Sequence, residues 1–200
     1  MRFRDYQNSR LTPMWVIIFV NILFYIGTSI ASKSPNLLMS VAQQFGASSD
    51  TLASQPWTLV TAMFIHAGIM HILFNMVTLY FYSMFLLQII GDVKYLLVYF
   101  IGGIIGNLTF ILLAPHSIGV GASGAIFALG GVLAVMRPRV KVMLFPLPVP
   151  MDLWIAIIVG FIVVSFIGNV AWQAHLGGLV TGLVAGFYFR RIERRQGIRY

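Results

Sequence analysis

Residues 121–136 read GASGAIFALGGVLAVM, an apolar stretch of 16 residues without a charge and with Ser123 near its start. A helix that spans a bilayer needs about 20 apolar residues, and 16 residues rise only about 24 Å at ~1.5 Å each. If this stretch crosses a membrane, its first turn must begin below the membrane surface. Ser123 would then lie in a recess.

The composition of the whole chain predicts a membrane setting. Its 200 residues are 59% hydrophobic and 9% charged, and the mean hydropathy is +0.90. A soluble domain of this length carries about 25% charged residues, so this chain has too few polar groups to cover a globular surface. We therefore predict a multi-pass integral membrane protein whose main partner is the lipid bilayer.

Six apolar stretches predict an all-α membrane protein, a bundle of six transmembrane helices formed by one domain over residues 1–200. The expected spans are residues 14–30, 69–90, 95–113, 121–136, 153–167 and 174–189. Residues 31–68 are too polar to span and too apolar for a free loop, so we expect interfacial helical pieces on the outer leaflet. The prolines within residues 146–150 exclude a helix and mark the turn before the fifth span.

Basic residues predict the orientation. The net charge is +8, and with six spans nearly all the positive residues fall on one side, which should be cytoplasmic. They are Arg2, Arg4, Arg10, Lys94, Arg137, Arg139, Lys141, Arg190, Arg191, Arg194, Arg195 and Arg199, with only Lys33 opposite. Both termini are thus expected in the cytoplasm, and the first apolar run is interpreted as a retained helix rather than a signal peptide. No aromatic-basic platform accompanies the charge, so no nucleic-acid partner is expected.

Glycines recur every four residues on two expected spans, which gives each helix one face of small residues. Such faces let helix backbones approach closely. We expect the sixth helix to pack tightly against a neighbour, and packing on the fourth would bring His175 towards Ser123. The glycines are Gly102 and Gly106 in the third span, and Gly178, Gly182 and Gly186 in the sixth.

Ser123 and His175 are candidates for a nucleophile and its base. A serine nucleophile needs a base to accept its proton and donors to stabilise the resulting oxyanion. His175 can be that base, since the ordinary pKa of histidine is about 6.5. All five carboxylates lie outside the spans or at their ends, so an aspartyl mechanism is excluded. Without a buried acid, the expected arrangement is a Ser–His dyad rather than a triad.

A second polar group lies in the second span. His71 and Asn75 are four residues apart and share one helix face. Together with the Ser123 N–H they could stabilise an oxyanion, although hydrogen bonding between helices is the alternative. Gly121 and Gly124 leave room around Ser123.

Metal and thiol chemistry have little support. The chain has no cysteine, so disulfides and thiolate catalysis are excluded. There is no His-Glu-x-x-His motif. Three histidines could bind a metal in principle, but no carboxylate or thiolate is available to complete such a site. We therefore expect no cofactor and no metal.

Three segments together resemble the signature blocks of the rhomboid family of intramembrane serine proteases. They are His66-x4-His71-x3-Asn75, Gly121-Ala122-Ser123-Gly124 and Ala174-His175-Leu176-Gly177-Gly178, in the family's order and on its second, fourth and sixth helices. The resemblance covers essentially the whole chain, as a minimal six-helix member of prokaryotic type. It lacks the Trp-Arg pair that some members carry in the first external loop.

The resemblance implies a role for each site residue. Ser123 would be the nucleophile and His175 the general base, with His71 and Asn75 at the oxyanion site and His66 supporting it. Phe127 stands where the family often has a tyrosine that packs on the catalytic histidine.

The resemblance also implies a serine endopeptidase that hydrolyses peptide bonds in or near transmembrane segments of membrane-anchored proteins. Its substrates would enter beside the fifth helix, beneath a cap formed by residues 168–173. The alternative is a catalytically silent relative that binds client transmembrane helices. A small transporter or channel would need intramembrane charges or inverted repeats, which are not evident. We expect a prokaryotic plasma membrane location; the natural substrate and the oligomeric state stay open.

Overall fold

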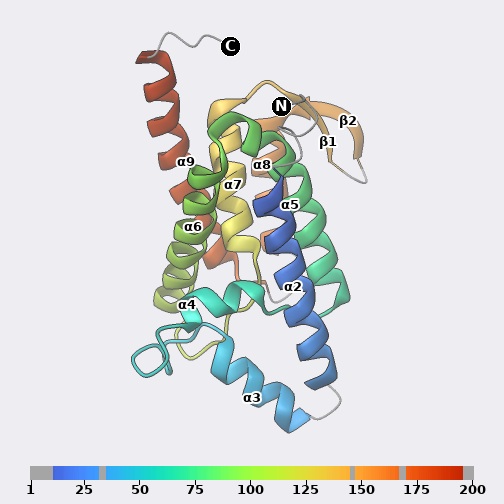
Figure 1. Cartoon of the computed structure of the whole chain (residues 1–200), viewed down its shortest axis with the longest axis vertical. Helices are drawn as coiled ribbons and strands as arrows, with labels where there is room; N and C mark the ends of the chain where they lie inside the picture. The colour runs from blue at the N-terminus through green and yellow to red at the C-terminus, as the bar shows by residue number, and fades with distance from the viewer. Residues whose placement is uncertain (1–10, 32–34, 145–146, 167–169, 196–200) are drawn as a thin grey trace.

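The computed structural model describes residues 11–31, 35–144, 147–166 and 170–195. It is a helical bundle with a two-stranded hairpin at one end and α3 at the other (Figure 1). In chain order the elements are α2 (Thr12–Ala31), α3 (Pro35–Phe45), α4 (Thr58–Thr61), the 3-10 helix η1 (Ala62–Phe64), α5 (Ile69–Ile90), α6 (Asp92–Leu113), α7 (Ser123–Met136), β1 (Lys141–Leu144), β2 (Leu147–Asp152), α8 (Leu153–Phe166) and α9 (Trp172–Arg195).

The predicted fold class, a mainly helical membrane protein, is confirmed. Three helices are long and apolar enough to cross a membrane, namely Thr12–Ile30, Ile69–Ile90 and Asp92–Leu113. The apolar helices α7 and α8 have 14 residues each, which is about 21 Å at ~1.5 Å per residue. That Ser123 lies in a recess below the membrane surface stays a prediction. Six membrane crossings and a single domain over residues 1–200 remain predictions.

Two helix boundaries differ from the expected spans for local reasons. The backbone of Gly121 has a φ of 125°, so α7 begins only at Ser123. The helix α9 extends from Trp172 to Arg195, well past the apolar residues, because the backbone hydrogen bonds of a helix do not depend on apolar side chains.

The hairpin is an element that the sequence did not predict. β1 and β2 pair antiparallel with Lys141 opposite Asp152, and Lys141 Nζ lies 2.7 Å from Asp152 Oδ1. The prediction that the prolines exclude a helix is confirmed for Pro148 and Pro150 in β2; Pro146 lies outside the described residues. Proline cannot donate a backbone hydrogen bond, so a proline-rich segment does not look like a strand.

The segment between α2 and α5 forms helical pieces, as predicted, while their place on the outer leaflet stays a prediction. They are α3, α4 and η1. The segment is fastened to the bundle by the side chain of Asn107 in α6, which donates to the carbonyl of Leu59 at 2.9 Å. Within the segment, Trp57 donates to the carbonyl of Gln44 at 3.1 Å.

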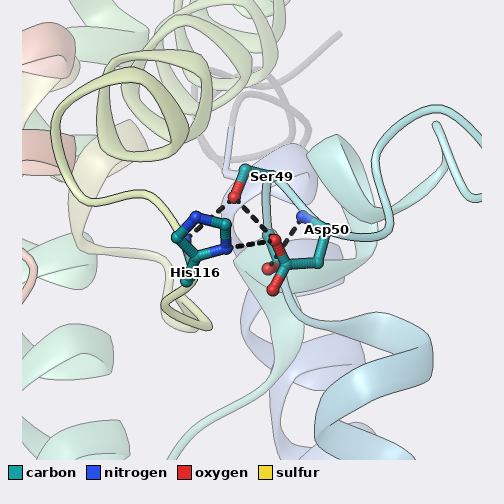
Figure 2. Close-up of polar contacts among 4 residues, drawn as sticks. Ser49, Asp50 and His116 are labelled. Carbon is teal, nitrogen blue, oxygen red and sulfur yellow. Dashed lines mark hydrogen bonds and ion pairs between the residues drawn. The ribbon is translucent and has the colours of Figure 1, made fainter.

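A polar cluster ties this segment to the connection between α6 and α7 (Figure 2). The backbone N–H of His116 donates to Ser49 Oγ at 2.9 Å, and His116 Nδ1 lies 2.8 Å from Asp50 Oδ1. Nearby, Ala47 and Gly119 form a two-way backbone bridge. These contacts fix the segment that leads into Ser123.

The helix α7 lies in the middle of the bundle, since twelve of its fourteen residues are buried. Its closest neighbour is α9. A Cβ on Gly178 would collide with the carbonyl oxygen of Gly124, and a Cβ on Gly182 with that of Ala128. The prediction that the sixth apolar helix packs tightly against the fourth is therefore confirmed.

Candidate active site

Ser123 and His175 meet where α7 and α9 begin. Ser123 is the first residue of α7, and His175 lies in the first turn of α9. The hydroxyl oxygen of Ser123 is 2.8 Å from Nε2 of His175, a hydrogen bond across 52 residues of sequence. This geometry allows the hydroxyl to donate its proton directly to the imidazole, as general-base catalysis requires.

The imidazole of His175 is held mainly by packing. The residue is only 1% exposed, and its ring lies 4.7 Å from that of Phe127, tilted by 37°. Phe127 in turn contacts Phe161 of α8 edge-to-face at 5.7 Å. The second ring nitrogen, Nδ1, has no hydrogen-bond partner, and none of the described carboxylates contacts this histidine. In the described structure, ring packing rather than a carboxylate therefore holds this imidazole in place.

The backbone around Ser123 supplies free hydrogen-bond donors. The first N–H groups of a helix have no partner within the helix, and no side chain caps α7 in the described structure. The first backbone bond of this helix runs from the N–H of Ile126 to the carbonyl of Ala122. Because the N–H groups at a helix N-terminus attract negative charge, this end of α7 suits a developing oxyanion.

His71 of α5 lies beside the nucleophile. The backbone N–H of Ala67 donates to its Nδ1 at 3.4 Å, so the ring proton belongs on Nε2. That Nε2 faces Gly121, where an added Cβ would stand 2.8 Å from Nε2 and 3.7 Å from Ser123 Oγ. Glycine at position 121 therefore lets an N–H donor approach the serine closely.

Asn75 and His66 occupy different settings. The Asn75 amide donates to the carbonyl of His71 at 3.0 Å, one turn earlier in its own helix, which leaves its second N–H for another acceptor. His66 precedes α5 and is buried, with its ring 5.0 Å from that of His71 in a T-shaped contact. Burial, more than the neighbouring His71, lowers the pKa of His66 to about 3, so this ring is neutral at ordinary pH.

The lack of a side chain at Gly124 lets α7 and α9 approach each other closely. A Cβ on Gly124 would stand 3.2 Å from the carbonyl oxygen of Ala174, the residue before His175. A Cβ on Gly106 of α6 would approach the same oxygen to 2.8 Å. The structure therefore places six of the site residues predicted from the sequence around the start of α7, namely Ser123, His175, His71, Gly121, Gly124 and Phe127. Asn75 and His66 each contact His71.

Several features of the site could not be read from the sequence. The carbonyl of Ala62 in η1 accepts from the N–H of Gly121 at 2.8 Å and so holds the turn before Ser123. In the Ser49–Asp50–His116 cluster, His116 contacts residues that lie 66 and 67 positions earlier in the sequence. No local sequence motif predicts such a contact. Residues 168 and 169 of the expected cap lie outside the described residues. No group of three potential metal ligands occurs in the described part of the chain.

Comparisons with known proteins find one matching family model and several similar sequences. A family model described as "Rhomboid domain" matches residues 53–192. The chain is 33% identical over 184 residues to rhomboid protease GluP of Bacillus subtilis, covering 90% of this chain and 35% of that protein. It is 31% identical over 189 residues to rhomboid-like protease 3 of Toxoplasma gondii, covering 89% of this chain and 69% of that protein.

For a third relative, the matched residues make up equal shares of the two chains. The putative rhomboid protease YdcA of Bacillus subtilis is 35% identical over 142 residues, which are 70% of each chain. The chain therefore spans about a third of the length of the first of these relatives and about two thirds of the other two.

Proposed function

The chain belongs to the rhomboid family, and from that membership we propose that it is a serine endopeptidase that acts within the membrane. Its substrates would be membrane-anchored proteins, cleaved in or near a transmembrane segment. The observation that carries the proposal is the 2.8 Å hydrogen bond between Ser123 Oγ and His175 Nε2. A partly buried hydroxyl–imidazole pair among apolar helices has a direct use in peptide hydrolysis.

The proposed reaction begins with a proton transfer. Nε2 of His175 accepts the hydroxyl proton while Ser123 Oγ attacks the carbonyl carbon of the scissile peptide. The resulting imidazolium donates that proton to the leaving amine, the C–N bond breaks, and an acyl-enzyme remains on Ser123. A water molecule then attacks this ester with His175 again as base, which releases the carboxyl product and restores the serine hydroxyl.

The tetrahedral intermediates carry a negative oxygen that needs donors. The geometry supports the backbone N–H of Ser123 at the start of α7 and the Nε2–H of His71 beside Gly121. We add the free N–H of the Asn75 side chain. Donors aimed in advance at the developing charge supply several kcal/mol of transition-state stabilisation, about 3 to 4 for a single donor.

The substrate class follows from the depth of the site. In lipid, an intact helix satisfies its own carbonyl groups and shields them from attack. The substrate must therefore unwind locally before its carbonyl reaches Ser123. We propose entry beside α8, whose Phe161 contacts Phe127 next to the catalytic histidine.

The alternative is a silent relative that binds client transmembrane helices without cleaving them. Such a protein has no need for a hydroxyl and an imidazole in hydrogen-bonding contact, and both are present here. This observation favours catalysis. The distribution of basic residues supports an orientation with both termini in the cytoplasm. We further propose a prokaryotic plasma membrane as the location.

The proposal is tested with the full chain reconstituted in vesicles together with a model transmembrane substrate. Ser123→Ala and His175→Ala should each abolish cleavage, with thermal unfolding close to that of the wild type. Ser54→Ala, which removes an exposed hydroxyl that bonds only to a local carbonyl, is the matched control and should cleave normally. Undiminished cleavage by Ser123→Ala would overturn the proposal.

A further inference from the structure

The last two turns of α9 form a surface pocket far along the helix from His175. Its volume is about 260 Å³, and it is lined by Phe187, Arg190, Arg191 and Arg194. These positions follow one another at spacings of three, one and three residues, which places all four side chains on one helix face. In Figure 1 this end of α9 projects from the end of the bundle that also carries the hairpin.

The pocket is strongly cationic. Three guanidinium groups line it, and the ion pairs found in the described structure, His116–Asp50 and Lys141–Asp152, involve none of them. Among the described residues, the only hydrogen bond from these arginines to a neighbouring helix runs from Arg190 to the carbonyl of Val135 at 3.4 Å. Like charges three and four residues apart repel one another, so an anion bound among them would relieve this repulsion.

The floor of the pocket is apolar. Phe187, one turn before the arginines, is 63% exposed, and its neighbours Val184 and Tyr188 are also exposed. Arginine stems can lie along apolar surface while their charged heads reach the membrane surface. A ligand that matches both parts needs an anionic head and a hydrocarbon tail.

We propose that this pocket binds the headgroup of an anionic phospholipid, with its phosphate among Arg190, Arg191 and Arg194 and an acyl chain along Phe187. Guanidinium groups present paired N–H donors that match phosphate oxygens. An integral membrane protein meets such lipids at the level where its apolar surface gives way to basic residues. The proposal concerns a site separate from the dyad and does not depend on catalysis.

The other explanation for these arginines is that they only set the topology of the last helix. Topological anchoring depends on the number of positive residues near the end of a span. It does not require them on one face, nor above an exposed phenylalanine. The two explanations therefore make different predictions for variants that lose the same number of positive charges. Only the lipid site requires that the lost charges lie in the pocket.

The test compares two double variants of the full chain, each lacking two positive charges at the same end of the bundle. Arg191→Gln with Arg194→Gln alters the pocket, and Lys94→Gln with Arg139→Gln is the control outside it. Both are reconstituted in phosphatidylcholine vesicles, and spin-labelled phosphatidylglycerol and phosphatidylcholine report the lipid held at the protein. The pocket variant should lose most of its preference for phosphatidylglycerol, a several-fold fall, while the control keeps the wild-type preference.

Two further arms make the outcome decisive. Phe187→Ala, which keeps every charge, should lower the amount of spin-labelled phosphatidylglycerol held at the protein and covers the case in which the pocket variant fails to insert. Inorganic phosphate should compete poorly, because it lacks a chain to contact Phe187. Equal loss in both double variants, no loss in either, an unaffected Phe187→Ala, or ready displacement by phosphate would each overturn the lipid site.

Discussion

The carbonyl oxygen of Gly124 in α7 occupies the space where a side chain on Gly178 of α9 would begin. Gly124 follows Ser123, and Gly178 is three residues after His175, so this contact lies directly beneath the reactive pair. Backbone touches backbone here because neither residue has a side chain. The short separation of the two helices depends on the lack of a side chain at both glycines. The distance of 2.8 Å between Ser123 Oγ and His175 Nε2 depends on it as well.

Gly178→Ala should therefore damage both the fold and the site. The added methyl group forces α7 and α9 apart, and overpacking of this kind costs about 1–3 kcal/mol. We expect a lower free energy of unfolding and a reduced cleavage rate for a model substrate. Gly160→Ala is the matched control, because a Cβ on this helical glycine meets nothing within 4 Å and alanine is the better helix former. Equal stability of the two variants would contradict the packing described here.

Gly121→Ala should impair turnover more than stability. With a φ of 125°, Gly121 adopts a conformation that alanine rarely takes, and its Cβ would stand 2.8 Å from Nε2 of His71. Displacing this donor should lower kcat by about 10²- to 10³-fold, as for loss of one oxyanion donor. Gly68→Ala is the control, since that position is extended and open. A Gly121→Ala protein with normal kcat would remove His71 from the oxyanion site.

Substitutions of Phe127 should separate stacking from hydrogen bonding. Phe127→Tyr keeps the ring that packs on His175 at 4.7 Å, so kcat/KM should stay near the wild-type value. Phe127→Ala frees the imidazole and leaves a cavity, with an expected cost of about 3–5 kcal/mol in stability and a marked fall in kcat/KM. If the alanine variant cleaves as well as the tyrosine variant, packing does not orient His175.

Asn75→Ala tests the amide as a third donor. Only one of its two N–H groups is committed in the structure, to the carbonyl of His71. Loss of the other should cost about 1–4 kcal/mol of transition-state stabilisation, seen as a lower kcat with little change in KM. Turnover equal to that of the wild type would assign Asn75 to helix structure alone.

Much of the site could be predicted from the sequence because its residues stand out against an apolar background. Ser123 and His175 begin apolar stretches, and the glycines near them recur at helical spacing. The position of His71 relative to Ser123 was not predictable in detail, since it depends on the φ of Gly121 and on the Ala67 N–H.

Other parts of the fold give no local signal. The Ser49–Asp50–His116 cluster forms only because the segment between α2 and α5 folds back onto the connection between α6 and α7. The hairpin lies in a proline-rich segment for which the sequence predicts a turn. Which residues of its two strands pair with each other cannot be predicted from the sequence alone. Long-range contacts of this kind are set by the packing of the whole bundle.

The central claim, that His175 activates Ser123 as a nucleophile, is tested most directly by covalent labelling with a fluorophosphonate probe. The folded, detergent-solubilised protein should be labelled at Ser123, as identified by mass spectrometry of its peptides. Ser123→Ala should not be labelled, and His175→Ala should be labelled far more slowly although its hydroxyl is intact. A folded wild-type protein that resists the probe, or one labelled equally fast without His175, would contradict the dyad.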